Sequence, residues 1–196
     1  MRERFEIVCV GASMGGVAAL QNLLPQLAAD FALPLVIVQH RGRAGGGGLC
    51  EFLRKHSPLP FDEPEDKEEI VPGRVYLAPR DYHLLVGREG FALSTESPVG
   101  FARPSIDVLF ETAADVYGAR AVGVILTGAN RDGARGLARI KARGGYAIVQ
   151  EPASAATRSM PEAALRATTV NDVLPLAEIA PLLNRLSRSQ EMMNAK

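Results

Sequence analysis

Residues 5–16 read FEIVCVGASMGG, and this segment already indicates the class of fold. Its first half, residues 5–10, is a short run rich in Val and Ile without polar alternation. Such runs are typical of strands that are covered on both faces in a parallel sheet. A second run of this kind occupies residues 33–39, and residues 15–29 between them carry apolar side chains at helical spacing. The sequence therefore predicts a strand, a helix and a second strand in succession.

The same alternation of strands and helices returns further along the chain. Residues 121–126 and 146–150 are apolar strand candidates, and shorter candidates lie at 74–77, 83–86 and 91–94. Residues 87–90 read as a hairpin turn between the last two, so part of the sheet is expected to be antiparallel. Helices are predicted at residues 49–56, 105–117, 132–142, 161–167 and 174–186.

This pattern predicts an α/β fold: a doubly wound, mostly parallel sheet with helices on both faces and a small antiparallel hairpin. Functional residues of such a fold lie just beyond the carboxyl ends of the strands. The chain has 196 residues, which fits one domain. We expect that domain to span residues 1–186, followed by a polar C-terminal tail at residues 187–196 that frays.

Composition restricts the classes of function. The 22 basic and 22 acidic side chains cancel, so there is no basic excess to hold a polyanion and we expect no nucleic-acid partner. Two cysteines, Cys9 and Cys50, make no disulfide framework, which favours a reducing compartment. The three histidines, His40, His56 and His83, are far apart in sequence, so no metal site is expected. The N-terminus lacks the long apolar segment of a signal peptide or membrane span, and we expect a soluble, cytoplasmic protein without membrane insertion.

Residues 11–16, GASMGG, admit two chemical interpretations. Gly11 and Gly16 match the outer glycines of a dinucleotide fingerprint, but Ser13 replaces the middle one, and His40 stands where an acidic residue should end the second strand. The same segment satisfies the Gly-x-Ser-x-Gly pattern of a nucleophile elbow, in which a serine sits on a sharp strand-to-helix turn. A helix that begins at Gly15 or Gly16 would aim free backbone N–H groups at a developing oxyanion. The non-catalytic alternative is a serine that caps this helix.

Two further strand ends carry side chains that suit a serine hydrolase. A serine hydroxyl needs a base, and His40 ends the strand that follows the first one along the chain. Asp132 follows the apolar strand at 121–126 and precedes a helix, so it can be read as a helix N-cap. It can also be read as the carboxylate that fixes the imidazole tautomer and stabilises the imidazolium.

From residue 7 to residue 186 the sequence resembles the catalytic domain of the chemotaxis protein-glutamate methylesterases. The resemblance rests on motifs in a fixed order: GASxGG at 11–16, VQH at 38–40, LAP at 77–79, HL at 83–84, RPSID at 103–107, LTG at 126–128, DGAxGL at 132–137, GG at 144–145, Gln150 and MPxA at 160–163. The resemblance implies that residues 1–186 form a methylesterase catalytic domain.

The resemblance implies Ser13 as nucleophile, His40 as general base and Asp132 as the residue that orients the base. It also implies hydrolysis of glutamate γ-methyl esters on the cytoplasmic helices of chemoreceptors, with release of methanol. Some members of the family also deamidate receptor glutamines. No cofactor is required.

Three departures from the family bear on the site. Met14 stands where Thr is common, which removes a hydroxyl but leaves a backbone donor, and the usual Met-Gly pair is Ala129-Asn130. The candidates for the oxyanion site or the ester pocket are therefore Met14, Gly15 and Ala129. The changed pocket keeps a second hypothesis open, a catalytically silent signalling or interaction module of the same fold.

The third departure concerns regulation. Familiar members carry an N-terminal phosphorylatable receiver domain, whereas this chain begins at the first strand. We therefore expect either an excised fragment or a stand-alone form, with an open cleft and activity independent of phosphoryl donors. An extended receptor helix needs a broad, shallow approach to Ser13, and Gly45 to Gly48 are a candidate for a mobile rim. His56 and His83 are expected to be dispensable for the chemistry.

Overall fold

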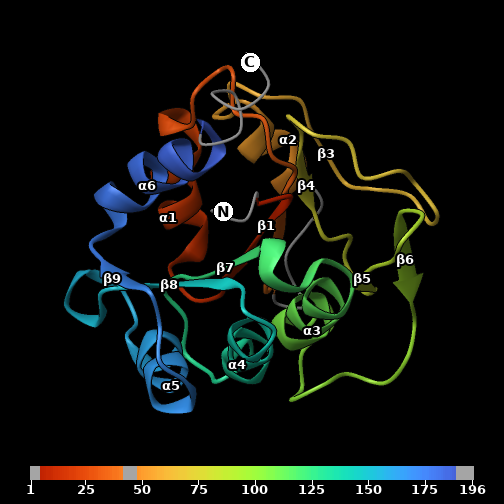
Figure 1. The fold of residues 1–196 in the computed structure, drawn as a ribbon. Coiled ribbons are helices and arrows are strands. Elements are labelled where there is room, and N and C mark those ends of the chain that lie inside the picture. The colour runs from red at the N-terminus through yellow and green to blue at the C-terminus, as the bar shows by residue number, and fades with distance from the viewer. Residues whose placement is uncertain (1–4, 42–47, 189–196) are drawn as a thin grey trace.

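The structure, a computed structural model, describes residues 5–41 and 48–188 (Figure 1). Within these ranges the core is a seven-stranded sheet in the order β3-β4-β2-β1-β7-β8-β9. Every neighbouring pair in it is parallel. The strands are β1 (Ile7–Ala12), β2 (Leu35–Gln39), β3 (Phe61–Asp62), β4 (Val75–Leu77), β7 (Ala121–Ile125), β8 (Tyr146–Gln150) and β9 (Asp172–Leu174).

The helices lie on both faces of the sheet, as predicted. Figure 1 shows α1 and α6 on one side, and α3, α4 and α5 on the other, and each side has its own apolar cluster. The helices are α1 (Gly16–Leu23), α2 (Leu49–Arg54), α3 (Ile106–Tyr117), α4 (Ala134–Ala142), α5 (Ser159–Ala167) and α6 (Leu176–Arg188). Single 3₁₀ turns lie at Leu24–Gln26, Gly118–Arg120 and Pro152–Ser154.

The apolar runs of the sequence became the central strands. All residues of β1, β2 and β7 are buried, because helices cover both faces of the sheet there. The edge strands β3 and β9 were not predicted. They have only two and three residues, too few to form a periodic pattern.

The hairpin is a correction to the predicted sheet. β5 (His83–Val86) and β6 (Phe91–Ser94) pair antiparallel as expected, but they form a separate two-stranded sheet. One reason is that the N–H of Val86 donates to Oγ1 of Thr112 on α3 (3.1 Å) and is not available to a further strand. The large sheet is consequently wholly parallel.

The C-terminal helix also extends further than predicted. α6 ends at Arg188, and Ser187 inside it is buried because its Oγ accepts a hydrogen bond from the N–H of Ala32 (2.8 Å). The expected tail therefore begins at least two residues later, and residues 189–196 lie outside the described part. Across the described ranges, none of the helices combines the length and apolar character needed to cross a bilayer.

Candidate active site

Three neighbouring strands bring the predicted site residues to one edge of the sheet. β1 lies between β2 and β7, and all three run parallel, so their carboxyl ends meet. Ser13 follows β1 directly, His40 follows β2 directly, and Asp132 lies in the loop between β7 and α4. The topology alone therefore accounts for the approach of three side chains that are far apart in sequence.

The turn at Ser13 is sharp and fixed by its backbone. The N–H of Ser13 donates to Thr127 O (3.0 Å), and the N–H of Gly16 donates to Ser13 O (2.8 Å). Gly15 has φ +79°, and a Cβ added there would come within 2.7 Å of the Ala156 Cβ. Glycine is thus required at position 15 both by conformation and by space. The segment has the form of a nucleophile elbow.

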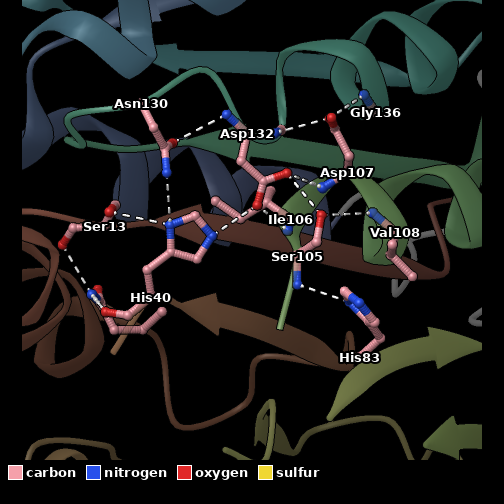
Figure 2. Close-up of polar contacts among 12 residues, drawn as sticks. Ser13, His40, His83, Ser105, Ile106, Asp107, Val108, Asn130, Asp132 and Gly136 are labelled. Carbon is pink, nitrogen blue, oxygen red and sulfur yellow. Dashed lines mark hydrogen bonds and ion pairs between the residues drawn. The ribbon is translucent and has the colours of Figure 1, made fainter. Parts of the chain in front are cut away.

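The three side chains form a continuous hydrogen-bonded series (Figure 2). Ser13 Oγ lies 3.2 Å from His40 Nδ1, and His40 Nε2 lies 2.8 Å from Asp132 Oδ2. A carboxylate can only accept, so Nε2 carries the proton and donates it to Asp132. Nδ1 then presents its lone pair to the serine hydroxyl, which is the arrangement that a general base requires.

Asp132 is held by more than its contact with His40. Its Oδ1 accepts from Ser105 Oγ (2.8 Å) and from the N–H of Asp107 (3.0 Å), and its Oδ2 also accepts from the N–H of Ile106 (2.7 Å). Burial alone would raise the pKa of Asp132, but the hydrogen bonds from His40 and from the backbone of α3 outweigh it. The pKa therefore lies below its ordinary value, and the carboxyl group stays ionised.

The predicted N-cap role of Asp132 is corrected by this geometry. The helix that follows it, α4, begins at Ala134 and has Gly133 as its N-cap, without a side-chain cap. Asp132 instead binds the first N–H groups of α3, a helix that is distant in sequence. It combines a helix cap with a hydrogen bond to His40, where the sequence offered these as alternatives.

Asp107 makes the reciprocal contact from α3. Its Oδ1 accepts from the N–H of Gly133 (2.9 Å) and of Gly136 (2.7 Å), at the start of α4. Burial raises the pKa of Asp107, and the nearby charge of Asp132 raises it further, against the lowering effect of the hydrogen bond from Gly136. Asp132 thus caps α3, the helix that carries Asp107, and Asp107 caps α4, the helix that follows Asp132. These contacts tie α3 to the loop that holds Asp132.

Gln39 fixes the relation between the other two strand ends. It is buried, and its Nε2 donates to the main-chain oxygens of Ser13 (2.9 Å) and His40 (2.8 Å). Gln39, Ser105 and Asp107 all belong to motifs visible in the sequence, but no local pattern assigns them these contacts. Their roles depend on long-range geometry.

The oxyanion and pocket candidates differ in their placement. The N–H of Gly16 is already bonded to Ser13 O, so it is not one of the free donors expected at the start of α1. Within the described ranges, the N–H groups of Met14 and Gly15 donate to no backbone oxygen. The side chain of Met14 is exposed and lines the cavity at Ser13, whereas Ala129 is exposed and does not line it.

That cavity has a volume of about 560 Å³ and opens on Ser13 and His40. Its wall includes Asn130 and Phe101, and Phe101 is fully exposed. A volume of this size accommodates a side chain of ordinary length together with part of the chain that carries it. Of the expected glycine rim, Gly45 to Gly47 lie outside the described residues, and Gly48 precedes α2.

The other two histidines do not line the cavity. His83 is buried behind the site, where its Nδ1 accepts from the N–H of Ser105 (3.2 Å) and its Nε2 faces Ser97 O (3.2 Å). His56 follows α2 and makes an edge contact with the Phe52 ring. That both are dispensable for the chemistry stays a prediction.

The chain is similar to known proteins over most of its length. The family described as CheB methylesterase matches residues 8–183. A protein of Leptospira interrogans, provisionally named protein-glutamate methylesterase/protein-glutamine glutaminase, is 47% identical over 94% of this chain and 96% of its own. Protein-glutamate methylesterase/protein-glutamine glutaminase 3 of Pseudomonas aeruginosa is 42% identical over 92% of this chain, which spans 54% of that protein.

A solved structure is similar as well. The CheB methylesterase catalytic domain of Thermotoga maritima superposes with a TM-score of 0.89 at 32% identity, covering 94% of this chain and 100% of that one. The family model spans most of the chain and the fold is shared with this solved domain, so the chain belongs to the CheB methylesterase family.

Proposed function

We propose that this chain is a serine hydrolase that removes methyl groups from glutamate γ-methyl esters of chemoreceptors. In this proposal Ser13 is the nucleophile, His40 the general base and Asp132 the carboxylate that orients it. The observation that carries the proposal is the continuous series of hydrogen bonds from Ser13 through His40 to a buried, fully hydrogen-bonded carboxylate. The family match and the names of the relatives supply the substrate class.

Acylation begins when Ser13 Oγ attacks the γ-carbonyl carbon and its proton passes to His40 Nδ1. The carbonyl electrons move to oxygen and give a tetrahedral oxyanion, for which the N–H groups of Met14 and Gly15 are the proposed donors. One such donor contributes on the order of 10²- to 10³-fold in rate. The C–O bond to the methoxy group then breaks, and His40 returns the proton to release methanol.

Deacylation repeats these steps with water. His40 Nδ1 takes a proton from the water as the water oxygen attacks the acyl carbon. The bond between the acyl carbon and Ser13 Oγ then breaks, and His40 returns the proton to Oγ. The glutamic acid product loses its proton to the solvent and leaves as a carboxylate. Asp132 stabilises the imidazolium in both halves, because its negative charge lies 2.8 Å from His40 Nε2. A glutamine side chain would follow the same course with ammonia as leaving group, which is the proposed deamidase activity.

The proposed partners are the cytoplasmic helices of chemoreceptors, and the proposed location is therefore the cytoplasm. The cavity supports a polymeric substrate, since exposed apolar side chains of Met14 and Phe101 border it and can contact a helix surface. No cofactor takes part in the proposed steps.

The direct test is methanol release from methylated receptor helices. The wild-type chain should release methanol, and Ser13→Ala should lose about 10⁴- to 10⁶-fold in rate. A general esterase would turn over many small esters rapidly without preference for the receptor. A catalytically silent interaction module would bind the helices without releasing methanol, and either result would contradict the proposal.

A further inference from the structure

Asn130, in the loop that carries Asp132, lies beside the atoms proposed to react. Its Nδ2 lies 3.2 Å from His40 Nδ1, the same nitrogen that Ser13 Oγ contacts at 3.2 Å (Figure 2). The side chain lines the cavity beside Ser13. Asn130 is therefore close enough to contact a substrate bound there.

The orientation of the Asn130 amide is set by the backbone. The N–H of Asp132 donates to Asn130 Oδ1 (3.1 Å), which assigns the oxygen to that side and the NH₂ group to the side of His40. Asn130 thus presents a hydrogen-bond donor to the site and no acceptor.

In the resting site two donors share one acceptor. Neutral His40 has a single lone pair on Nδ1, since Nε2 carries the proton, and both the Ser13 hydroxyl and the Asn130 NH₂ point at it. When His40 takes the serine proton, Nδ1 itself becomes a donor. Asn130 then loses its acceptor and needs another one at that step of the reaction.

Whether the NH₂ group of Asn130 finds a new acceptor depends on the leaving group. His40 Nδ1 must give its proton to the leaving atom, so that atom lies within hydrogen-bond distance of Nδ1, beside Asn130. A methoxy oxygen has two lone pairs and can take the proton on one while accepting from Asn130 on the other. The nitrogen of a primary amide has one lone pair in the tetrahedral intermediate, and its remaining N–H groups would face the donor of Asn130.

We propose that Asn130 is a specificity-determining residue that favours a γ-methyl ester over a γ-carboxamide at this site. The inference rests on the proposed function and goes beyond it, because it assigns the choice between the two leaving groups to one side chain. A site that forms a hydrogen bond with one leaving group discriminates against the other, because the other leaves a polar group of the site without a partner.

The experiment compares kcat/KM for methanol release and for ammonia release from matched receptor helices, one carrying a methyl-glutamate and one a glutamine. In Asn130→Ala the ester-to-amide ratio should fall about tenfold, chiefly through slower ester hydrolysis. Asn130→Asp keeps the oxygen that accepts from Asp132 and replaces the donor with an acceptor, so the ratio should fall further. Asn22→Ala, an exposed asparagine on α1, is the matched control and should leave the ratio unchanged.

The possible failures are distinct. If the wild type hydrolyses the ester but the ratio is the same in all Asn130 variants, Asn130 does not select the leaving group and this inference is wrong while the proposed function stands. If both rates fall equally, Asn130 is only structural and the inference is equally wrong. If the wild type releases neither methanol nor ammonia, the proposed function fails and the inference fails with it.

Discussion

The inner and outer halves of the site are built differently. The inner half, Asp132 with Ser105 and Asp107, is buried, and hydrogen bonds to two helices hold its carboxylates in place. The outer half, Met14 and Phe101, is exposed and borders the cavity. The inner half fixes His40 in one tautomer, and we expect the exposed side chains of the outer half to be exchangeable without disturbing the fold. Chemistry should therefore depend on the first region and substrate choice on the second.

Replacing Asp132 is the most severe way to test this division. Asp132→Ala should lower kcat by about 10⁴-fold, because His40 loses its orienting carboxylate. It should also lower the free energy of unfolding by about 3 kcal/mol, since the buried N–H groups of Ile106 and Asp107 lose their acceptor. Kinetics and denaturant unfolding measure the two effects.

Ser13→Ala is the matched variant, with a comparable loss of rate but a change in unfolding free energy of only about 0.5 kcal/mol. If Asp132→Ala were as stable as Ser13→Ala, the reciprocal capping of α3 and α4 would not stabilise the inner half.

Asp132 and Asp107 should have opposite effects on the free energy of unfolding at acidic pH. In the unfolded chain the pKa of an aspartate is about 3.9. The lowered pKa of Asp132 adds stability that is full above this pH and is lost as the pH falls through its folded value. The raised pKa of Asp107 acts in the opposite direction and removes stability as the pH rises through its folded value.

Unfolding free energies measured from about pH 2 to pH 6 check this, since this range begins below the pKa of an aspartate in the unfolded chain. Asp132→Asn should flatten the rise in stability with pH, and Asp107→Asn should steepen it. The same change of slope in both variants would contradict the assignment of opposite shifts.

The smallest effect is expected at the rim. Phe101 is fully exposed, so Phe101→Ala should change the free energy of unfolding by no more than about 0.5 kcal/mol. It should raise KM for receptor helices a few-fold, roughly the effect of one lost apolar contact, and leave hydrolysis of a small soluble ester unchanged. An equal loss with both substrates would place Phe101 in the chemistry and remove the distinction between the two halves.

The sequence predicted the nucleophile and base candidates better than the residues around them. Ser13 and His40 follow short apolar runs that are typical of buried parallel strands, so their meeting at one sheet edge followed from the fold class. Asp132 was harder, because the helix that it caps is α3 and not its own neighbour α4. A local pattern cannot indicate a contact of that kind.

Asn130 was marked in the sequence only as a departure from the family that the chain resembles. Its function depends on a distance to His40 and on the backbone N–H that orients its amide, neither of which has a sequence signature. Gln39 is a similar case, since its bridge between two main-chain oxygens exists only after β1 and β2 have paired.

The central claim, that His40 activates Ser13 as a nucleophile, is tested most directly by labelling with a fluorophosphonate probe. The modified residue is located by mass spectrometry in the wild type and in His40→Ala. We expect one phosphonylated serine, Ser13, in the wild type and almost none in His40→Ala. Labelling of another serine, or undiminished labelling of Ser13 without His40, would contradict it.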